Sequence, residues 1–311
     1  MFRRVTVVPA MVAVLALGLA GCSTTSPSAS GGGQSGGGSA TVVVAASIDA
    51  WGSVLSQLGG THVRATSIIS DPATDPHAYE PTPVDGRTIA DSKVFVENGV
   101  GYDAWAARAV AASPDPARTV VDVGQVTGTP DNGNPHRWYS PGDVAKVADA
   151  ITAGLKTADP TDAAYFDGQR AAFDSTGLGR YHQLIDDIRT RYSGVKVGAS
   201  ESIVSPLAEA LGLDLVTPAS LLRAISEGND PSAADKATVD AQIAGKQIAV
   251  YVYNSQNSTP DVAAQVDAVK AQGIPVVQVT ETLSPAGASF QDWQAAQLTG
   301  LQAALAQATG Q

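Results

Sequence analysis

Short apolar runs alternate with amphipathic segments over most of the chain. In the first half, runs of the buried-strand type are separated by segments in which apolar residues recur at helical spacing, as between Ile48 and Leu58. Strands interleaved with helices predict βαβ units and a parallel sheet. The strands expected in this half are residues 42–46, 63–69, 94–96 and 119–123.

The middle of the chain has a different pattern. Residues 140–191 contain no convincing strand-like run and are typical of helices that break near Asp159-Pro160 and at Gly177-Leu178-Gly179. This stretch is too long for a simple crossover between strands, so we interpret it as a connection between domains. Alternation then resumes, with strands expected at 195–198, 248–253 and 275–279 and a closing amphipathic helix at 290–306.

These patterns predict an α/β fold with two lobes, each built on a mainly parallel sheet flanked by helices, joined by a long helical connection. The chain after residue 40 is longer than a single hydrophobic core usually organises, which also favours two domains. We expect an N-terminal lobe at 41–140, the helical connection at 141–192 and a C-terminal lobe at 193–311.

The N-terminus has the features of an export signal. Arg3 and Arg4 precede an apolar run that ends at Leu19-Ala20-Gly21-Cys22. A basic start, a short apolar stretch and small residues at its end mark a cleaved signal peptide. The sequence around Cys22 resembles the bacterial lipoprotein box, in which this cysteine is lipidated. We therefore expect a signal peptide at 1–21, followed at 22–40 by the lipidated cysteine and a flexible Ser- and Gly-rich linker.

Composition narrows the chemistry. Cys22 is the only cysteine, which excludes an intrachain disulfide and thiolate metal ligands within the folded domain. The 30 acidic residues outnumber the 19 lysines and arginines, giving a net charge of −11, which argues against nucleic acid as a partner and suits the attraction of cations. A metal site in this chain would use imidazole, carboxylate, amide, backbone or water ligands.

Two short sequence motifs each contain a Pro-His pair in a turn-rich loop that follows a strand-like run. They are Asp75-Pro76-His77-Ala78-Tyr79-Glu80 and Asn134-Pro135-His136-Arg137-Trp138. The chain has only four histidines, and the neutral imidazole is the commonest metal ligand among side chains. An isolated loop histidine is more often structural, but the shared context of His77 and His136 favours a metal site built from two loops.

Two glutamates occupy matching positions in the second half of the chain. In open α/β sheets, ligands bind beyond the carboxyl ends of the strands. Glu201 closely follows the strand at 195–198, where a first helical turn would favour its ionised form, and Glu281 follows the strand at 275–279. Either acid alone is more typical of a cap or loop, so the prediction rests on the convergence of all four residues. Asn254 and Gln256 follow another strand end and are candidates to orient the ligands.

The complete pattern resembles the solute-binding lipoproteins of ABC importers for manganese or zinc. The features that carry the resemblance are the lipoprotein start, D-P-H-x-Y-E, the later P-H-x-W, the Ser-Glu at 200–201 and the T-[DE]-x-L at 280–283. The resemblance implies two α/β lobes linked by a long, rigid helix. It also implies metal ligands at His77, His136, Glu201 and Glu281, the last in place of the family's usual Asp.

The resemblance implies a transport protein and not an enzyme. Such a protein captures one divalent metal ion between its lobes and delivers it to an ABC permease, whose ATPase drives import. The lipid at Cys22 would hold it, as a monomer, at the extracytoplasmic face of the cell membrane. Two imidazoles with two carboxylates make an oxygen-rich site, which favours Mn²⁺, while the higher intrinsic affinity of nitrogen and oxygen ligands for Zn²⁺ keeps that ion a close second.

Two alternatives remain open from the sequence. A metal-dependent hydrolase on an α/β scaffold would use Glu201 or Glu281 as a base and would keep an exchangeable water on the metal. A binding lipoprotein for a metal chelate or an organic solute would have a wide cleft, with His77 and His136 too far apart to share one ion.

Replacing the two histidines tests the central hypothesis. We expect His77→Ala and His136→Ala each to weaken metal binding, because each removes one imidazole from the same ion. The measurement is the metal content of protein purified without added metal, followed by competition between Mn²⁺ and Zn²⁺. Unchanged binding in each variant would contradict the shared site.

Overall fold

The computed structural model describes residues 41–74, 76, 79–257 and 259–311. The expected signal peptide, the lipidation site Cys22, the linker and His77 lie outside the described residues. No helix in the described part of the chain combines the length and the apolar character needed to span a membrane.

The N-terminal lobe is built on a four-stranded parallel sheet with the order β2-β1-β3-β4. Helices follow the strands as the apolar periodicity predicts, and the short helix α4 after the fourth strand is an addition. In chain order the elements are β1 (Val42–Ile48), α1 (Asp49–Gly59), β2 (Val63–Ile69), α2 (Pro83–Asp91), β3 (Val94–Glu97), α3 (Ala104–Ala112), β4 (Thr119–Asp122) and α4 (Val123–Thr127).

The C-terminal lobe repeats this plan with a second four-stranded parallel sheet, in the order β6-β5-β7-β8. Its strand β6 was not predicted, because two residues are too few to show an alternating pattern. The elements are β5 (Lys196–Ala199), α8 (Ser205–Leu211), β6 (Asp214–Leu215), α9 (Ala219–Ser226), α10 (Ala233–Ala244), β7 (Val250–Asn254), α11 (Pro260–Ala271), β8 (Val276–Val279) and α12 (Phe290–Thr309).

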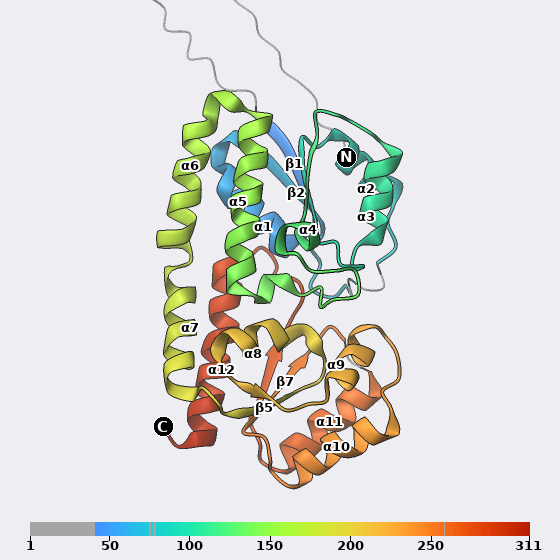
Figure 1. The fold of residues 1–311 in the computed structure, drawn as a ribbon, viewed down its shortest axis with the longest axis vertical. Coiled ribbons are helices and arrows are strands. Elements are labelled where there is room, and N and C mark those ends of the chain that lie inside the picture. Colours follow the sequence, from blue (N-terminus) through green and yellow to red (C-terminus); the bar gives the residue numbers. More distant parts are fainter. Residues whose placement is uncertain (1–40, 75, 77–78, 258) are drawn as a thin grey trace, which may run out of the picture. The chain divides into compact units, whose positions relative to one another are not determined.

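The segment between the two sheets is helical throughout most of its length (Figure 1). The helices α5 (Pro141–Ala158), α6 (Ala163–Ala172) and α7 (Gly179–Tyr192) are separated by a 3₁₀ turn at Pro160–Asp162 and a π-helical turn at Phe173–Gly177. Both interruptions coincide with the breaks expected from Pro160 and from the Gly-Leu-Gly sequence. The predicted fold class, two parallel-sheet α/β lobes joined by helix, is confirmed.

The largest hydrophobic cluster runs through both lobes and the connection. It contains Trp51 from α1, Tyr181 from α7 and Trp293 from α12, all essentially without exposed surface. Helix α12 returns from the C-terminal sheet to pack on α7 and also contacts α1 (Figure 1). Because close-packed interiors resist deformation, this shared core restricts how far the lobes can separate.

Polar bonds between distant segments reinforce this junction. The backbone N–H of Leu283 donates to Asp49 Oδ2 over 3.0 Å, and the N–H of Phe290 donates to Ser53 Oγ over 2.9 Å. Both acceptors lie on α1, whereas Leu283 lies in the loop after β8 and Phe290 is the first residue of α12. The loop that follows β8 is therefore fixed to the N-terminal lobe.

Asp49 makes this junction sensitive to pH. Burial raises the pKa of its carboxyl to about 7, although the N–H of Leu283 acts in the opposite direction. A pKa raised in the folded state favours folding below the unfolded pKa near 3.8, and this contribution is lost as pH rises towards 7.

Asp49→Asn should remove the loss of stability at higher pH, because the amide does not ionise, while its oxygen still accepts the N–H of Leu283. Between pH 4 and pH 8, we expect the free energy of unfolding of the variant to rise relative to the unmodified protein by up to about 4 kcal/mol, at about 1.4 kcal/mol per pKa unit. Urea unfolding across this pH range is the measurement. Asp186→Asn, at an exposed carboxylate on α7, is the control. A difference that stays constant with pH would contradict the assignment.

Candidate metal centre

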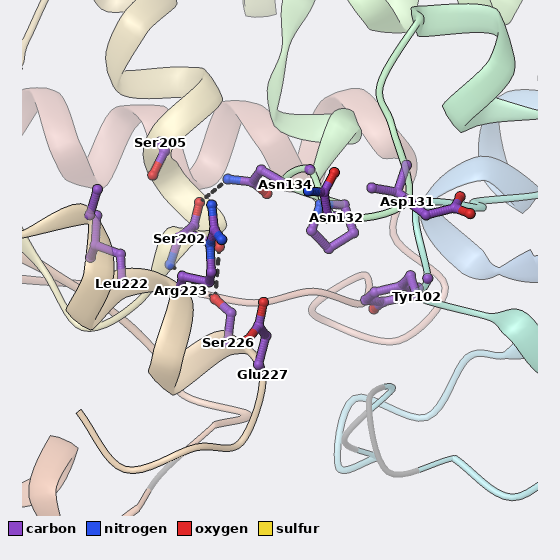
Figure 2. Close-up of a pocket in the computed structure, with 15 residues that line it drawn as sticks. Tyr102, Asp131, Asn132, Asn134, Ser202, Ser205, Leu222, Arg223, Ser226 and Glu227 are labelled. Carbon is purple, nitrogen blue, oxygen red and sulfur yellow. Dashed lines mark hydrogen bonds between the residues drawn. The ribbon is translucent and has the colours of Figure 1, made fainter. Parts of the chain in front are cut away.

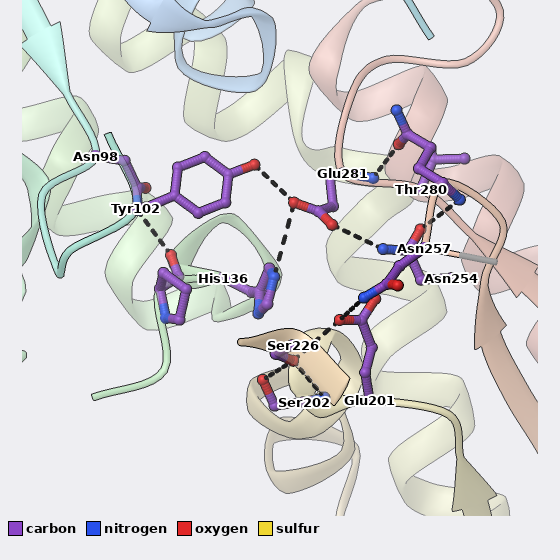
Figure 3. Close-up of polar contacts among 12 residues, drawn as sticks. Asn98, Tyr102, His136, Glu201, Ser202, Ser226, Asn254, Asn257, Thr280 and Glu281 are labelled. Carbon is purple, nitrogen blue, oxygen red and sulfur yellow. Dashed lines mark hydrogen bonds and ion pairs between the residues drawn. The ribbon is translucent and has the colours of Figure 1, made fainter. Parts of the chain in front are cut away.

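Three of the four predicted ligands converge at one point. His136, Glu201 and Glu281 each offer a ligand atom, and these atoms all lie within 4.8 Å of one another. All three side chains have 0% exposed surface. His136 comes from the loop after α4, whereas the two glutamates follow β5 and β8 (Figure 3). The fourth, His77, lies outside the described residues.

Asn134 sets the orientation of the His136 ring. The Asn134 Oδ1 atom lies 2.8 Å from His136 Nδ1 and also accepts the backbone N–H of His136 over 3.0 Å. Because a carbonyl oxygen only accepts, this contact places a proton on Nδ1, and in the neutral imidazole the lone pair is then on Nε2. His136 Nε2 lies 3.9 Å from Glu281 Oε2, so that lone pair is on the side of the carboxylates.

The Glu281 carboxylate is held by one donor from each lobe. The Tyr102 hydroxyl donates to Oε2 over 2.7 Å, and Asn254 Nδ2 donates to Oε1 over 2.7 Å (Figure 3). Gln256 Oε1 accepts the backbone N–H of Glu281 over 2.6 Å. The expected orienting role of Asn254 and Gln256 is therefore visible as direct contacts, whereas Tyr102 was not predicted.

Glu201 sits differently from the sequence-based expectation. Its backbone is extended, and it precedes the 3₁₀ turn Ser202–Val204, so α8 begins only at Ser205. The carboxylate is consequently not in the first turn of an α-helix. Instead, Ser226 Oγ donates to Glu201 Oε2 over 3.0 Å, and Asn257 Nδ2 lies 3.4 Å from the same oxygen.

Further polar bonds tie the loops of the two lobes together. Asn134 Nδ2 donates to the Ser202 carbonyl over 2.7 Å, which links the loop of His136 to that of Glu201. Behind His136, Asn98 Nδ2 donates to the Pro135 carbonyl over 3.0 Å, and Trp51 Nε1 donates to Asn98 Oδ1 over 2.9 Å. The His136 loop is therefore anchored to both the N-terminal core and the C-terminal lobe.

A cavity of about 450 Å³ adjoins the three residues (Figure 2). Tyr102, Asn134 and Ser226 line it, and each of them bonds to one of the three predicted ligands. The cavity therefore adjoins the side chains that contact the predicted ligands.

The charge of the site calls for a cation. Two carboxylates without exposed surface lie together, and burying anions is costly unless they are compensated. Burial raises the pKa of the neighbouring Tyr139 hydroxyl well above its ordinary value, and repulsion from Glu281 and Glu201 adds to this effect. An imidazole and two carboxylates are suitable ligands for a divalent transition metal.

The comparison with known families agrees with this geometry. Residues 44–304 match the family described as ZnuA, the periplasmic component A of the zinc-uptake complex. The chain belongs to the ZnuA family. The predicted resemblance to metal-binding components of ABC importers is thereby confirmed.

Solved structures share the ZnuA-type fold. A Cd-bound periplasmic metal-binding protein from Candidatus Liberibacter asiaticus is 17% identical, with a TM-score of 0.70 over 85% of this chain and 100% of that one. The Mn-bound form is 18% identical with the same TM-score and coverage. A crystal structure of ZnuA is 20% identical, with a TM-score of 0.66 over 86% of this chain and 99% of that one.

Family membership settles the general class of the protein. ZnuA-like proteins are extracytoplasmic metal-binding transport proteins that work with an ABC permease and an ATPase, and they are not enzymes. The alternative of a metal-dependent hydrolase is therefore wrong. A metal-binding protein of the ABC-importer type is the class to which this chain belongs.

The bond from Tyr102 to Glu281 gives a test of the arrangement. Tyr102→Phe removes a donor that fixes the carboxylate, and loss of such an orienting group costs about 10–100-fold in metal affinity. Tyr253→Phe removes a hydroxyl that lies 3.4 Å from Gln278 and away from Glu281, and it serves as the control. Competition titration with a chelating indicator measures both affinities. Equal affinities in the two variants would remove Tyr102 from the site.

Proposed function

We propose that this protein binds one divalent transition-metal ion between its lobes and delivers it to an ABC permease. His136, Glu201 and Glu281 serve as ligands, with His77 as the fourth. The observation that carries the proposal is the gathering of three ligand atoms within 4.8 Å in a fully buried setting. His77 enters through the sequence motif, since it lies outside the described residues.

The ligand set favours manganese. Carboxylate oxygens suit Mn²⁺ better than imidazoles do, and this site contributes two carboxylates. The Mn-bound and Cd-bound relatives show that proteins of this fold hold such ions. The Irving–Williams order nevertheless gives Zn²⁺ the higher intrinsic affinity, so selectivity for manganese has to come from geometry and metal supply.

Capture and release would require only small movements. The bonds Tyr102–Glu281 and Asn134–Ser202 cross between the lobes directly beside the ligands. A slight separation of the lobes would break both bonds and would move His136 away from the glutamates, while the shared core around α1, α7 and α12 stays intact. The cavity lined by Ser226 and Asn134 would provide the route for the ion.

The N-terminal segment supports a tethered protein. We propose that Cys22 is lipidated and that residues 22–40 link the anchor to the folded part as a monomer at the extracytoplasmic face of the membrane. A flexible linker of this composition lets an anchored domain reach a permease in the same membrane.

The decisive experiment compares metal preference in matched variants. Protein purified without added metal should contain one ion per chain, and Mn²⁺ and Zn²⁺ should compete for it. Glu201→His replaces an oxygen ligand by an imidazole, and we expect the ratio of Zn²⁺ to Mn²⁺ affinity to rise about tenfold or more. Glu209→Gln, at an exposed position of α8, is the control.

Two outcomes would overturn the proposal. Protein that binds neither metal above background would contradict the function itself. A ratio of affinities that is the same in Glu201→His and Glu209→Gln would contradict the role of Glu201 as a ligand. Mass spectrometry of metal content and competitive titration together distinguish these outcomes.

A further inference from the structure

A second group of carboxylates lies at the carboxyl ends of the N-terminal strands. Glu97 is the last residue of β3 and Asp122 the last residue of β4, and the two are partners in the parallel register. Asp103 follows in the loop before α3. Because register partners on neighbouring parallel strands project to the same face, the first two carboxylates lie on one side of the sheet.

These carboxylates line a cavity of about 550 Å³ that adjoins the one beside His136, with Val100, Gly101 and Asp131 in the walls of both. Asp131 contributes a fourth carboxylate to its wall. Among the described residues that line the cavity there is no lysine, arginine or histidine. The cavity therefore concentrates negative charge without a basic side chain to balance it.

Glu97 provides the main evidence that this cavity binds a ligand. Its side chain is only 8% exposed, and its buried Oε2 atom has no hydrogen-bond partner among the described residues. A buried carboxylate oxygen without a partner is costly, because neither water nor a donor replaces its lost hydration. Burial, together with repulsion from Asp103 and Asp122, raises the pKa of Glu97 to about 7.

The other two carboxylates are already held in place by the backbone. Asp103 accepts the N–H groups of Asn98 and Gly99 over 2.7 and 2.8 Å. Asp122 accepts the backbone N–H of Gln125 over 3.1 Å and its side-chain amide over 2.8 Å. These bonds fix the positions of the Asp103 and Asp122 carboxyl groups beside Glu97, and burial raises the pKa of Asp103.

We propose that this cavity binds one hydrated alkaline-earth cation, Mg²⁺ or Ca²⁺, with Glu97 as a direct ligand. The three carboxylates do not meet the 4.8 Å mutual spacing that the His136 group meets, so an ion here retains part of its water shell. Mg²⁺ commonly binds through one or two carboxylates and several waters, and Ca²⁺ also takes mixed carboxylate and water ligands. The lining offers no imidazole or thiolate, which disfavours Zn²⁺.

Binding at this cavity would act on the loop that serves the transport site. Residues 98–102 run between Glu97 and Asp103, and Tyr102 from this loop donates to Glu281. A cation that neutralises Glu97 removes the repulsion against Asp103, whose carboxylate holds the start of that loop. The occupied cavity would therefore hold Tyr102 more firmly in its position beside Glu281.

The test uses the full chain with the transport site weakened by His136→Ala. Mg²⁺ and Ca²⁺ are titrated separately by calorimetry up to about 10 mM, which covers the weak range known for Ca²⁺ modules. We expect one ion per chain and a rise in thermal midpoint. Adding Glu97→Gln should weaken the binding at least about tenfold, whereas Glu209→Gln on α8 should leave it unchanged.

The failures of this test are distinct from those of the proposed transport function, because Glu97→Gln changes the second cavity and leaves Glu201 and Glu281 in place. Absence of heat and of a thermal shift with both ions would overturn the second site. Equal binding in Glu97→Gln and Glu209→Gln would remove Glu97 from it. If Glu97→Gln stabilises the protein above pH 7 and neither ion stabilises the parent, the cavity holds a proton and the cation proposal is wrong. Far-UV circular dichroism verifies that each variant is folded.

Discussion

The structure depends on the burial of two glutamate carboxylates beside an imidazole at the junction of the lobes. Such a cluster is costly in a protein interior unless donors and a cation compensate it. Tyr102, Asn254 and Ser226 supply donors from three different elements, and each of them reaches one carboxylate oxygen. The strand ends bring the acids together, and the loops and α9 bring the groups that stabilise them.

The same junction explains why the two lobes are connected so extensively. A cluster of candidate ligands from loops of both lobes keeps its geometry only if the two sheets are held in a fixed position relative to each other. The core formed by α1, α7 and α12 supplies this constraint, and the bond from Leu283 to Asp49 adds a polar contact near Glu281. The resulting fold differs from a freely hinged pair of domains, because wide separation of the lobes would disturb a close-packed interior.

The sequence predicted the elements and the acids, but not the groups that orient them. Strand-end positions predicted His136, Glu201 and Glu281 as candidate ligands, since parallel sheets bring their carboxyl ends to one edge. Tyr102 and Ser226 gave no comparable signal. Tyr102 lies 179 positions from the residue it contacts, and Ser226 ends a helix whose apolar face alone is visible in the pattern. Such contacts depend on how the lobes pack, which no local periodicity encodes.

The choice of Glu at position 281 can be understood from its partners. Tyr102 and Asn254 approach the two carboxylate oxygens from opposite lobes, each over 2.7 Å. An aspartate would be one methylene shorter and would not reach both donors without movement of the backbone that Gln256 fixes. The glutamate side chain is therefore long enough to accept from both donors, one of which, Tyr102, comes from the other lobe.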